Sequence, residues 1–247
     1  MLSRSQIKHI QSLQRKKYRT LHQQYLIEGP KIVEEAVVFN APKIEIFATA
    51  MWVNAQEDLL SKYSPVVNIV SDKDLDRISQ LKTANQVLAL LPIEKAEPRK
   101  KLSGLNLMLE NIQDPGNLGT IIRCADWFGA SAVFCTPDCA DLYNPKVLQA
   151  CMGSNFYVPV YYLEAETLIE NAHVPIYAAT VSGENLYNVK PQENVLILIG
   201  NESKGLSAAL KESCDTEITI PKKGKAESLN AANATAVILS YFANALR

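Results

Sequence analysis

The stretch LNLMLENIQDPGNLGTIIRCADWFGA, residues 105–130, decides the fold of this chain. It opens with an apolar run at 105–109, which has the length of a buried strand. The polar turn Asp114-Pro115-Gly116-Asn117 interrupts the apolar pattern. Apolar residues at helical spacing then follow as far as Gly129, a glycine typical of a helix end. A second apolar run at 132–135 follows at once. The pattern predicts a β-loop-α-β unit with a parallel strand pair. Asn117 and Arg123 should lie near the strand ends, where such units bind ligands.

The second half of the chain continues this alternation of strands and helices. We expect further strands at 158–161, 176–180, 195–199 and 217–220, with helices at 146–150 and 165–172 between them. The run at 195–199 is apolar throughout, which favours a central strand of a parallel sheet. It leads into Gly200-Asn201-Glu202, polar residues that suit a ligand edge. The expected last helix, 231–246, is rich in small apolar residues and should be buried, either within the chain or against a second subunit.

The first ninety or so residues predict a smaller α/β domain. Strands are expected at 25–27, 44–48, 66–70 and 86–91, and helices at 30–38, 57–62 and after Ser71. The segment from Pro92 to Lys101 is charged and contains two prolines, as linkers do. We therefore expect a smaller α/β domain at 1–95, a linker at 96–103, and a larger α/β domain at 104–247.

Bulk composition excludes several classes of protein. The 247 residues carry a formal net charge of −1, and none of the apolar runs approaches the roughly 20 residues of a membrane span. The five cysteines form no C-x-x-C pair, so neither a disulfide framework nor a zinc site is indicated, and we expect no metal. Free thiols fit a cytoplasmic protein.

Positive charge gathers at the N-terminal end. Six Lys or Arg residues and no acid precede Glu28, and His9, Tyr18, His22 and Tyr25 lie among them. A cationic segment with interleaved rings suits an RNA backbone with nearby bases. A solvated helix face is the equally weighted alternative, and a mitochondrial transit peptide a more remote one. The spacing of Ile7, Ile10 and Leu13 predicts a helix that continues toward the strand at 25–27. The candidate RNA contacts are Arg15, Lys16, Lys17 and Arg19, together with Lys222 and Lys223 of a second basic loop.

Three segments in order carry a resemblance to a known family: NIQDPGNLGTIIRCADWFGA, then LILIGNESKGLS, then ITIPKKGKAESLNAANATAVIL. The trio resembles the three motifs of the TrmH/SpoU family of RNA ribose 2′-O-methyltransferases. The segment IKHIQSLQRKKYRTLHQQYLIEGPKIVEEA is similar to the ribosomal-protein-like domain that many members carry ahead of the catalytic one. The resemblance implies S-adenosylmethionine as cofactor, RNA as partner, a homodimer, and a C-terminal segment threaded as a trefoil knot. Its accessory domain favours large-subunit rRNA over tRNA.

The resemblance also implies roles for individual residues. Residues matching the catalytic positions are Asn117, Arg123, Glu202, Ser228 and Asn230. Residues matching the cofactor edge are Thr180, Gly200, Asn201, Ile220 and Leu229.

The chemistry needs a group that helps a ribose hydroxyl lose its proton, and the histidines lie outside all three motifs. Arg123 is the family's candidate. It either loses its own proton transiently beside an RNA phosphate, or keeps its charge and stabilises the developing alkoxide. The second route is physically easier because an arginine pKa lies above about 12.

Two rival functions remain open at this point. A dinucleotide-dependent oxidoreductase would share the β-α-β start, but the loop shows only Gly116-x-x-Gly119 and lacks the G-x-G-x-x-G cradle. A catalytically inert RNA-binding module would keep the fold and lose the chemistry, which the intact motif residues disfavour. Calorimetry with S-adenosylmethionine and with NAD separates these hypotheses.

Overall fold

The computed structural model describes residues 2–81, 83–94, 97–98 and 101–244, which form two compact units. The first unit takes in the chain up to 95 together with 143–156, and the second takes in 96–142 and 157–247. The grouping of 143–156 with the first unit departs from the expected continuous domain at 104–247. The expected linker at 96–103 falls partly on residues 96, 99 and 100, outside the described residues.

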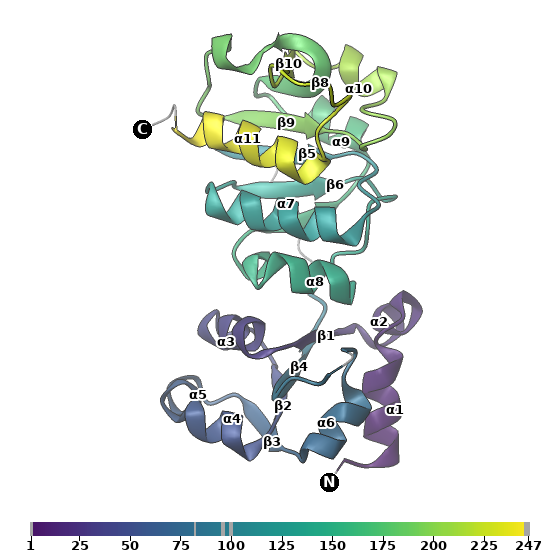
Figure 1. Cartoon of the computed structure of the whole chain (residues 1–247), viewed down its shortest axis with the longest axis vertical. Coiled ribbons are helices and arrows are strands. Elements are labelled where there is room, and N and C mark those ends of the chain that lie inside the picture. The colour runs from purple at the N-terminus through teal and green to yellow at the C-terminus, as the bar shows by residue number, and fades with distance from the viewer. Residues whose placement is uncertain (1, 82, 95–96, 99–100, 245–247) are drawn as a thin grey trace. The chain divides into compact units, whose positions relative to one another are not determined.

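The first unit is built on a four-stranded sheet with the order β1-β4-β2-β3. Strands β1 and β2 both run antiparallel to β4, and β2 runs parallel to β3. The elements, drawn in Figure 1, are α1 (Arg4–Ser12), α2 (Lys16–His22), β1 (Gln24–Glu28), α3 (Pro30–Val38), β2 (Glu45–Ala48), α4 (Ala50–Ala55), α5 (Glu57–Tyr63), β3 (Val66–Ile69), α6 (Asp72–Ile78), β4 (Val87–Pro92) and α8 (Pro145–Cys151).

Local sequence explains where several of these helices begin. Ser3 accepts a hydrogen bond from the Gln6 N–H while Gln6 reaches back to the Ser3 N–H, the reciprocal cap that starts α1. Ser71 caps α6 through the Asp74 N–H, as expected. The expected continuous N-terminal helix is wrong: α1 ends at Ser12 and α2 is a separate helix after it.

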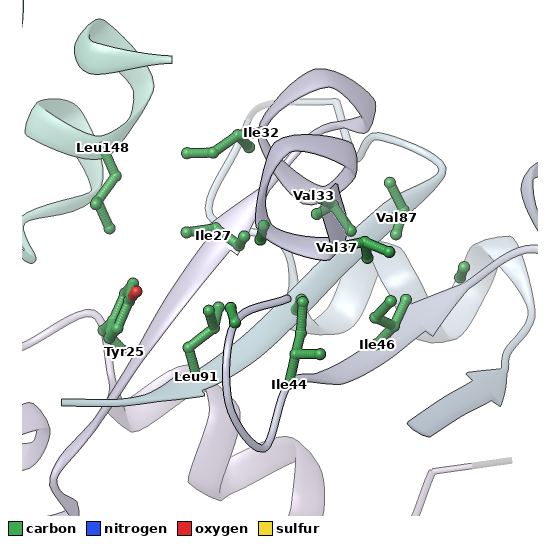
Figure 2. Close-up of a cluster of buried hydrophobic side chains, with 14 of the residues drawn as sticks. Tyr25, Ile27, Ile32, Val33, Val37, Ile44, Ile46, Val87, Leu91 and Leu148 are labelled. Atoms are coloured by element: carbon green, nitrogen blue, oxygen red, sulfur yellow. The ribbon is translucent and has the colours of Figure 1, made fainter. Parts of the chain in front are cut away.

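One face of this sheet is covered by α3, α4 and α5. Its core cluster includes Ile27 and Val87 from the strands and Val33 and Val37 from α3 (Figure 2). Leu148 of α8 belongs to the same cluster, which is why 143–156 group with the first unit.

The opposite face of the sheet is covered by α1 and α6. Ile7, Ile10 and Leu13 are buried there with Phe47 and Leu75. The basic N-terminal segment is therefore an integral part of the domain, with its apolar side in the core.

The second unit contains a six-stranded sheet, every neighbouring pair of which is parallel, with the order β10-β8-β9-β5-β6-β7. The expected parallel pair β5–β6 and the central position of β9 are confirmed. The elements are β5 (Leu105–Leu109), α7 (Pro115–Trp127), β6 (Ala132–Cys135), a short 3-10 helix η1 (Ser154–Phe156, grouped with the first unit), β7 (Val160–Tyr162), α9 (Ala165–Glu170), β8 (Ile176–Asn185), η2 (Leu186–Asn188), β9 (Val195–Ile199), α10 (Ala208–Glu212), β10 (Thr216–Thr219) and α11 (Ala231–Asn244).

Helices cover both faces of this sheet, as the sequence predicts for an α/β fold. Leu168 of α9 and Leu210 of α10 pack with Met108, Leu196 and Leu198 on one face. On the other face α7 and α11 lie side by side, as Figure 1 shows. The trefoil knot implied by the resemblance stays a prediction. Among the described residues, none of the helices is both long and apolar enough to cross a membrane.

Candidate active site

The first part of the site is the start of α7, directly after strand β5. Asp114 caps the helix by accepting a hydrogen bond from the Asn117 N–H at 2.8 Å, and Pro115 occupies the first helical position, where a missing N–H does no harm. Asn117 is thereby held in the first turn of α7 with its side-chain amide half-buried. The turn fixes an amide group at the carboxyl edge of the central strands.

Asn117 links the other two motifs by hydrogen bonds. Its Nδ2 donates to Oε1 of Glu202, which follows β9. Its Oδ1 accepts from Nδ2 of Asn230 at 2.9 Å. Asn230 in turn caps α11, because its Oδ1 accepts from the N–H groups of Ala232 at 3.0 Å and Asn233 at 3.3 Å. Three of the five expected catalytic residues thus form one hydrogen-bonded chain, Glu202–Asn117–Asn230, which we call the motif chain.

The loop after β9 holds Glu202 in this chain. A Cβ placed on Gly200 would lie 2.4 Å from both the Gly205 carbonyl carbon and the Leu206 nitrogen, so the backbones approach closely at this position. Asn201 ties the loop together, because its Oδ1 accepts from Ser203 N–H at 2.9 Å and its Nδ2 donates to a carbonyl of the first motif at 2.9 Å. Asn201, expected at the cofactor edge, has its side chain committed to holding the loop.

Strand β8 supplies the expected cofactor residue Thr180. Ala178 of β8 pairs with Leu198 of β9 on one side and with Glu217 of β10 on the other. The next residue of β10, Ile218, pairs with Glu184. Residues 179–183 of β8 therefore form a bulge that has no partner in β10. The Thr180 hydroxyl is buried, and its oxygen has no hydrogen-bond partner within the described structure. A buried polar atom without a partner is unfavourable unless a ligand satisfies it. An unsatisfied buried hydroxyl at this edge fits a bound polar cofactor.

The third motif follows β10 as an exposed loop. Residues 221–230 are all exposed, including the expected catalytic Ser228 and the basic pair Lys222 and Lys223. Leu229 exposes 48% of its surface, a large apolar side chain available to a ligand. Ile220 is half-buried where the loop begins. Within the described residues Ser228 makes no side-chain hydrogen bond, so the structure does not join it to the motif chain.

Arg123 lies farther along α7 and is not joined to the motif chain. Arg123 lies six positions after Asn117, so the two side chains point roughly 120° apart around the helix. Arg123 is exposed, and over the described parts of the chain it makes neither an ion pair nor a side-chain hydrogen bond. Its charge acts on its neighbour, since burial raises the pKa of the Cys124 thiol and Arg123 opposes that rise. The guanidinium is thus available for a partner outside the described chain.

Sequence reasoning missed a second set of groups that supports the first motif. Asn111 adopts a left-handed conformation, φ +56°, and its N–H donates to Thr136 Oγ1 at 2.9 Å. The next N–H, of Ile112, donates to Cys139 Sγ at 3.2 Å. A hydrogen bond with Cys135, the largest influence, lowers the pKa of the Cys139 thiol to about 7 against the effect of burial. In the sequence, Asn111 was the available signal for this turn, because asparagine adopts the left-handed conformation more readily than most residues.

The basic residues of α1 and α2 divide into two groups. Arg15, Lys16 and Lys17 are exposed, as a role in RNA contact requires. Arg19 is only 4% exposed, and its Nη1 donates to the carbonyls of Leu13 and Gln14, each at 2.8 Å. We therefore correct the expectation for Arg19, which joins α2 to the end of α1. Tyr25, expected among the rings of the cationic N-terminal segment, is likewise buried in strand β1.

A search of the described residues finds no cluster of three or more His, Cys, Asp or Glu side chains that could hold a metal ion. The cysteines at 124, 135, 139, 151 and 214 are all free thiols.

Comparison with known proteins connects this geometry to a family. Residues 104–240 match the SpoU rRNA Methylase family, and residues 4–89 match the MRM3-like substrate binding domain. The chain is 32% identical over 243 residues to a Bacillus subtilis protein named 23S rRNA (guanosine(2553)-2′-O)-methyltransferase RlmP, covering 95% of this chain and 94% of that one.

Two solved structures resemble both units together. One is a putative TrmH-family RNA methyltransferase from Porphyromonas gingivalis, with a TM-score of 0.87, 35% identity, and 98% of each chain covered. The other is an AdoMet-bound rRNA methyltransferase from Sinorhizobium meliloti, with a TM-score of 0.87, 27% identity, and coverage of 100% of this chain and 97% of that one. With the three motif segments joined as described, this chain belongs to the SpoU rRNA methylase family.

Proposed function

We propose that this protein transfers a methyl group from S-adenosylmethionine to a ribose 2′-hydroxyl of large-subunit rRNA. The motif chain is the single observation that carries the proposal, because it joins residues of all three motifs at the carboxyl edge of a parallel sheet. The named function of the B. subtilis relative, which matches both units, favours rRNA over tRNA as the substrate. Five free thiols suit a reaction in the cytoplasm.

Each part of the site has a task in this reaction. Bound S-adenosylmethionine supplies an electrophilic methyl group for an in-line displacement. Thr180 and the Gly200 turn would hold the cofactor, together with the half-buried Ile220 and the exposed Leu229. The motif chain fixes the Glu202 carboxylate so that it can orient the incoming ribose.

Arg123 binds the RNA phosphate beside the reacting nucleotide and stabilises the alkoxide that forms as the hydroxyl passes its proton to that phosphate or to water. Its exposure, and the absence of a side-chain partner for it among the described residues, support this assignment. Ser228 lies in the exposed third-motif loop, where it contacts the same nucleotide. The fixed charge of arginine and its planar group suit a phosphate better than lysine does.

The function is tested by incubating the protein with S-adenosylmethionine carrying a labelled methyl group and either large-subunit rRNA or tRNA that lack modifications. We expect label in ribose 2′-O-methyl groups of the rRNA. Calorimetry should show binding of S-adenosylmethionine and none of NAD. Binding of NAD alone would support the oxidoreductase, and cofactor binding with label only in tRNA would move the substrate to tRNA.

We also propose a homodimer formed through α11. One face of this helix, including Thr235, Leu239 and Phe242, is buried within the chain. The opposite face lines an open groove. Tyr187 beside it is 55% exposed and contacts the Tyr241 ring. A largely apolar helix face bordered by an exposed tyrosine is typical of a protein–protein interface. The groove is lined by Tyr187, Ala236, Val237, Ser240, Tyr241 and Asn244.

Sedimentation equilibrium at micromolar concentration should give about twice the 27.3 kDa chain mass. Val237→Lys should give a monomer, because an ammonium group would be desolvated in the interface. Val66→Lys is the matched control: Val66 is 62% exposed on the edge strand β3 of the other unit, where lysine is tolerated. A wild-type monomer would contradict the proposal, as would equal dimerisation of all three proteins.

A further inference from the structure

Three aromatic rings form a row on the surface of the first unit. His9 of α1 meets His22 of α2 edge to face, with ring centroids 4.7 Å apart. Tyr18, one helical turn before His22, has its ring plane within 13° of the His22 ring at a centroid distance of 6.4 Å. Tyr18 is half-buried and His22 is exposed. We call these three side chains the ring row.

The ring row is held in place by polar contacts on both of its helices. The His9 Nε2 and the Gln24 Oε1 lie 2.8 Å apart, which fixes one end of the row to strand β1. The buried Arg19 guanidinium, on the same helix as Tyr18 and His22, donates to carbonyls at the end of α1. Its contacts therefore fix α2 against α1. A surface that is already ordered loses little conformational entropy when a ligand binds.

Several exposed cations lie on or directly beside the two helices that carry the row. Lys8, Arg15, Lys16 and Lys17 are exposed, and the Lys17 Nζ lies 6.0 Å from the centre of the Tyr18 ring. The nearest acidic element is α6, which packs on α1 and carries exposed Asp72 and Asp76, whereas its Asp74 is paired with Arg77 at 3.5 Å. The α1–α2 side thus combines ring surfaces with several cations and contains no acid of its own.

We propose that the ring row is a stacking platform for an unpaired base of the RNA, with Lys16 and Lys17 on the adjacent phosphates. Phosphate contacts alone do not distinguish paired from unpaired RNA, whereas aromatic rings need a base face, which a continuous duplex keeps covered. The ligand class is therefore RNA with a bulged or looped-out nucleotide. This inference rests on the proposed function, since it names a feature of the RNA that the enzyme recognises.

The test uses the full-length protein and two RNA hairpins. One carries a single bulged 2-aminopurine, and the other pairs that base so that the stem is continuous. Dissociation constants are measured from low to high salt, and 2-aminopurine fluorescence reports stacking. Wild type should bind the bulged hairpin about ten-fold more tightly, a typical value for one base on an aromatic side chain. Its fluorescence should fall on binding.

Three variants separate stacking from charge. Tyr18→Leu with His22→Leu should bring the preference for the bulge to about one without changing the salt slope, because no phosphate contact is removed. Lys16→Gln with Lys17→Gln should keep the preference for the bulge and reduce the salt slope by about 1.5, because each phosphate contact contributes roughly 0.7 to 0.9 to that slope. Tyr63→Leu is the matched control, since Tyr63 also lies half-buried beneath a lysine, Lys62 at 5.1 Å, on α5 of the same unit.

Equal preference for the bulge in wild type and the ring variant would overturn the platform, as would an equal loss in Tyr63→Leu or the absence of any preference in wild type. If the double variant fails to fold, the single variant His22→Leu at an exposed position replaces it. The ratio of its dissociation constants for the paired and the bulged hairpin then decides the question. Failure of the proposed function is seen separately, as an absence of methyl transfer to rRNA by wild type.

Discussion

Arg123→Ala should reduce the rate of methyl transfer by about 10²- to 10³-fold or more, the effect of removing one group that stabilises developing negative charge. Affinity for S-adenosylmethionine should stay within a few-fold, because the proposed cofactor edge is formed by β8, the β9 turn and the third-motif loop. Stability should change by less than about 0.5 kcal/mol, since the side chain is exposed and unpartnered in the described structure. Single-turnover kinetics, calorimetry and thermal melting measure the three quantities.

Two further variants sharpen this result. Arg123→Lys should be nearly as inactive as the alanine variant, because an ammonium group cannot match the planar guanidinium on a phosphate. Lys211→Ala removes an exposed cation from α10 in the same unit and should leave the rate unchanged. A folded Arg123→Ala protein that no longer binds the cofactor would show that the assigned division between RNA and cofactor contacts is wrong.

Gly200→Ala should remove cofactor binding and destabilise the second unit by about 1–3 kcal/mol, the usual effect of forcing an extra carbon into a packed site. The new Cβ would lie 2.4 Å from backbone atoms of Gly205 and Leu206, which cannot rotate away as a flexible side chain can. The loop must shift, and Glu202 would move with it out of its hydrogen bond with Asn117. Calorimetry and denaturant unfolding measure the two effects.

Gly224→Ala is the matched control for the glycine prediction. A Cβ at Gly224 would meet nothing within 4 Å, and Gly224 lies in the exposed loop of the third motif. Unfolding free energy and cofactor affinity should both match wild type. If Gly200→Ala behaved in the same way, the close approach of the two backbone segments would have no energetic importance.

The two central strands of the second unit, β5 and β9, were predictable because every residue in them is buried. Leu105–Leu109 and Val195–Ile199 have the expected bounds, because a continuous apolar run of this length is typical of a strand that is buried on both faces of a sheet. Strand β8 extends from the expected end at Thr180 to Asn185. Its second part pairs with β10 after the bulge at 179–183, and that pairing depends on a distant segment that local sequence does not specify.

The break between α1 and α2 was not predicted because the apolar spacing of Ile7, Ile10 and Leu13 continues a helical pattern. The buried guanidinium of Arg19 lies beside this break, where it binds carbonyls that the end of α1 leaves without helical partners. An arginine in a basic sequence looks like a surface residue until its environment is known. The same limit applies to Cys139, whose contact with the Ile112 N–H joins residues distant in sequence.

The motif residues could be named from sequence, but their connections could not. Asn117, Glu202 and Asn230 follow from the resemblance, and the structure adds the hydrogen bonds between them. It also gives Asn201 a role in holding the loop, which the resemblance had placed at the cofactor edge. Side-chain geometry of this kind depends on three chain segments that meet only after folding.

The motif chain has a kinetic consequence. Its two hydrogen bonds join residues separated by 85 and 113 positions. Contacts between residues so far apart form late, because the entropy of closing long loops must be lost before such contacts stabilise the chain. Strands β5 and β6, which flank α7, are close in sequence and can pair much earlier. The part of the site that orients the ribose is therefore completed only after most of the secondary structure has formed, when the start of α11 reaches α7.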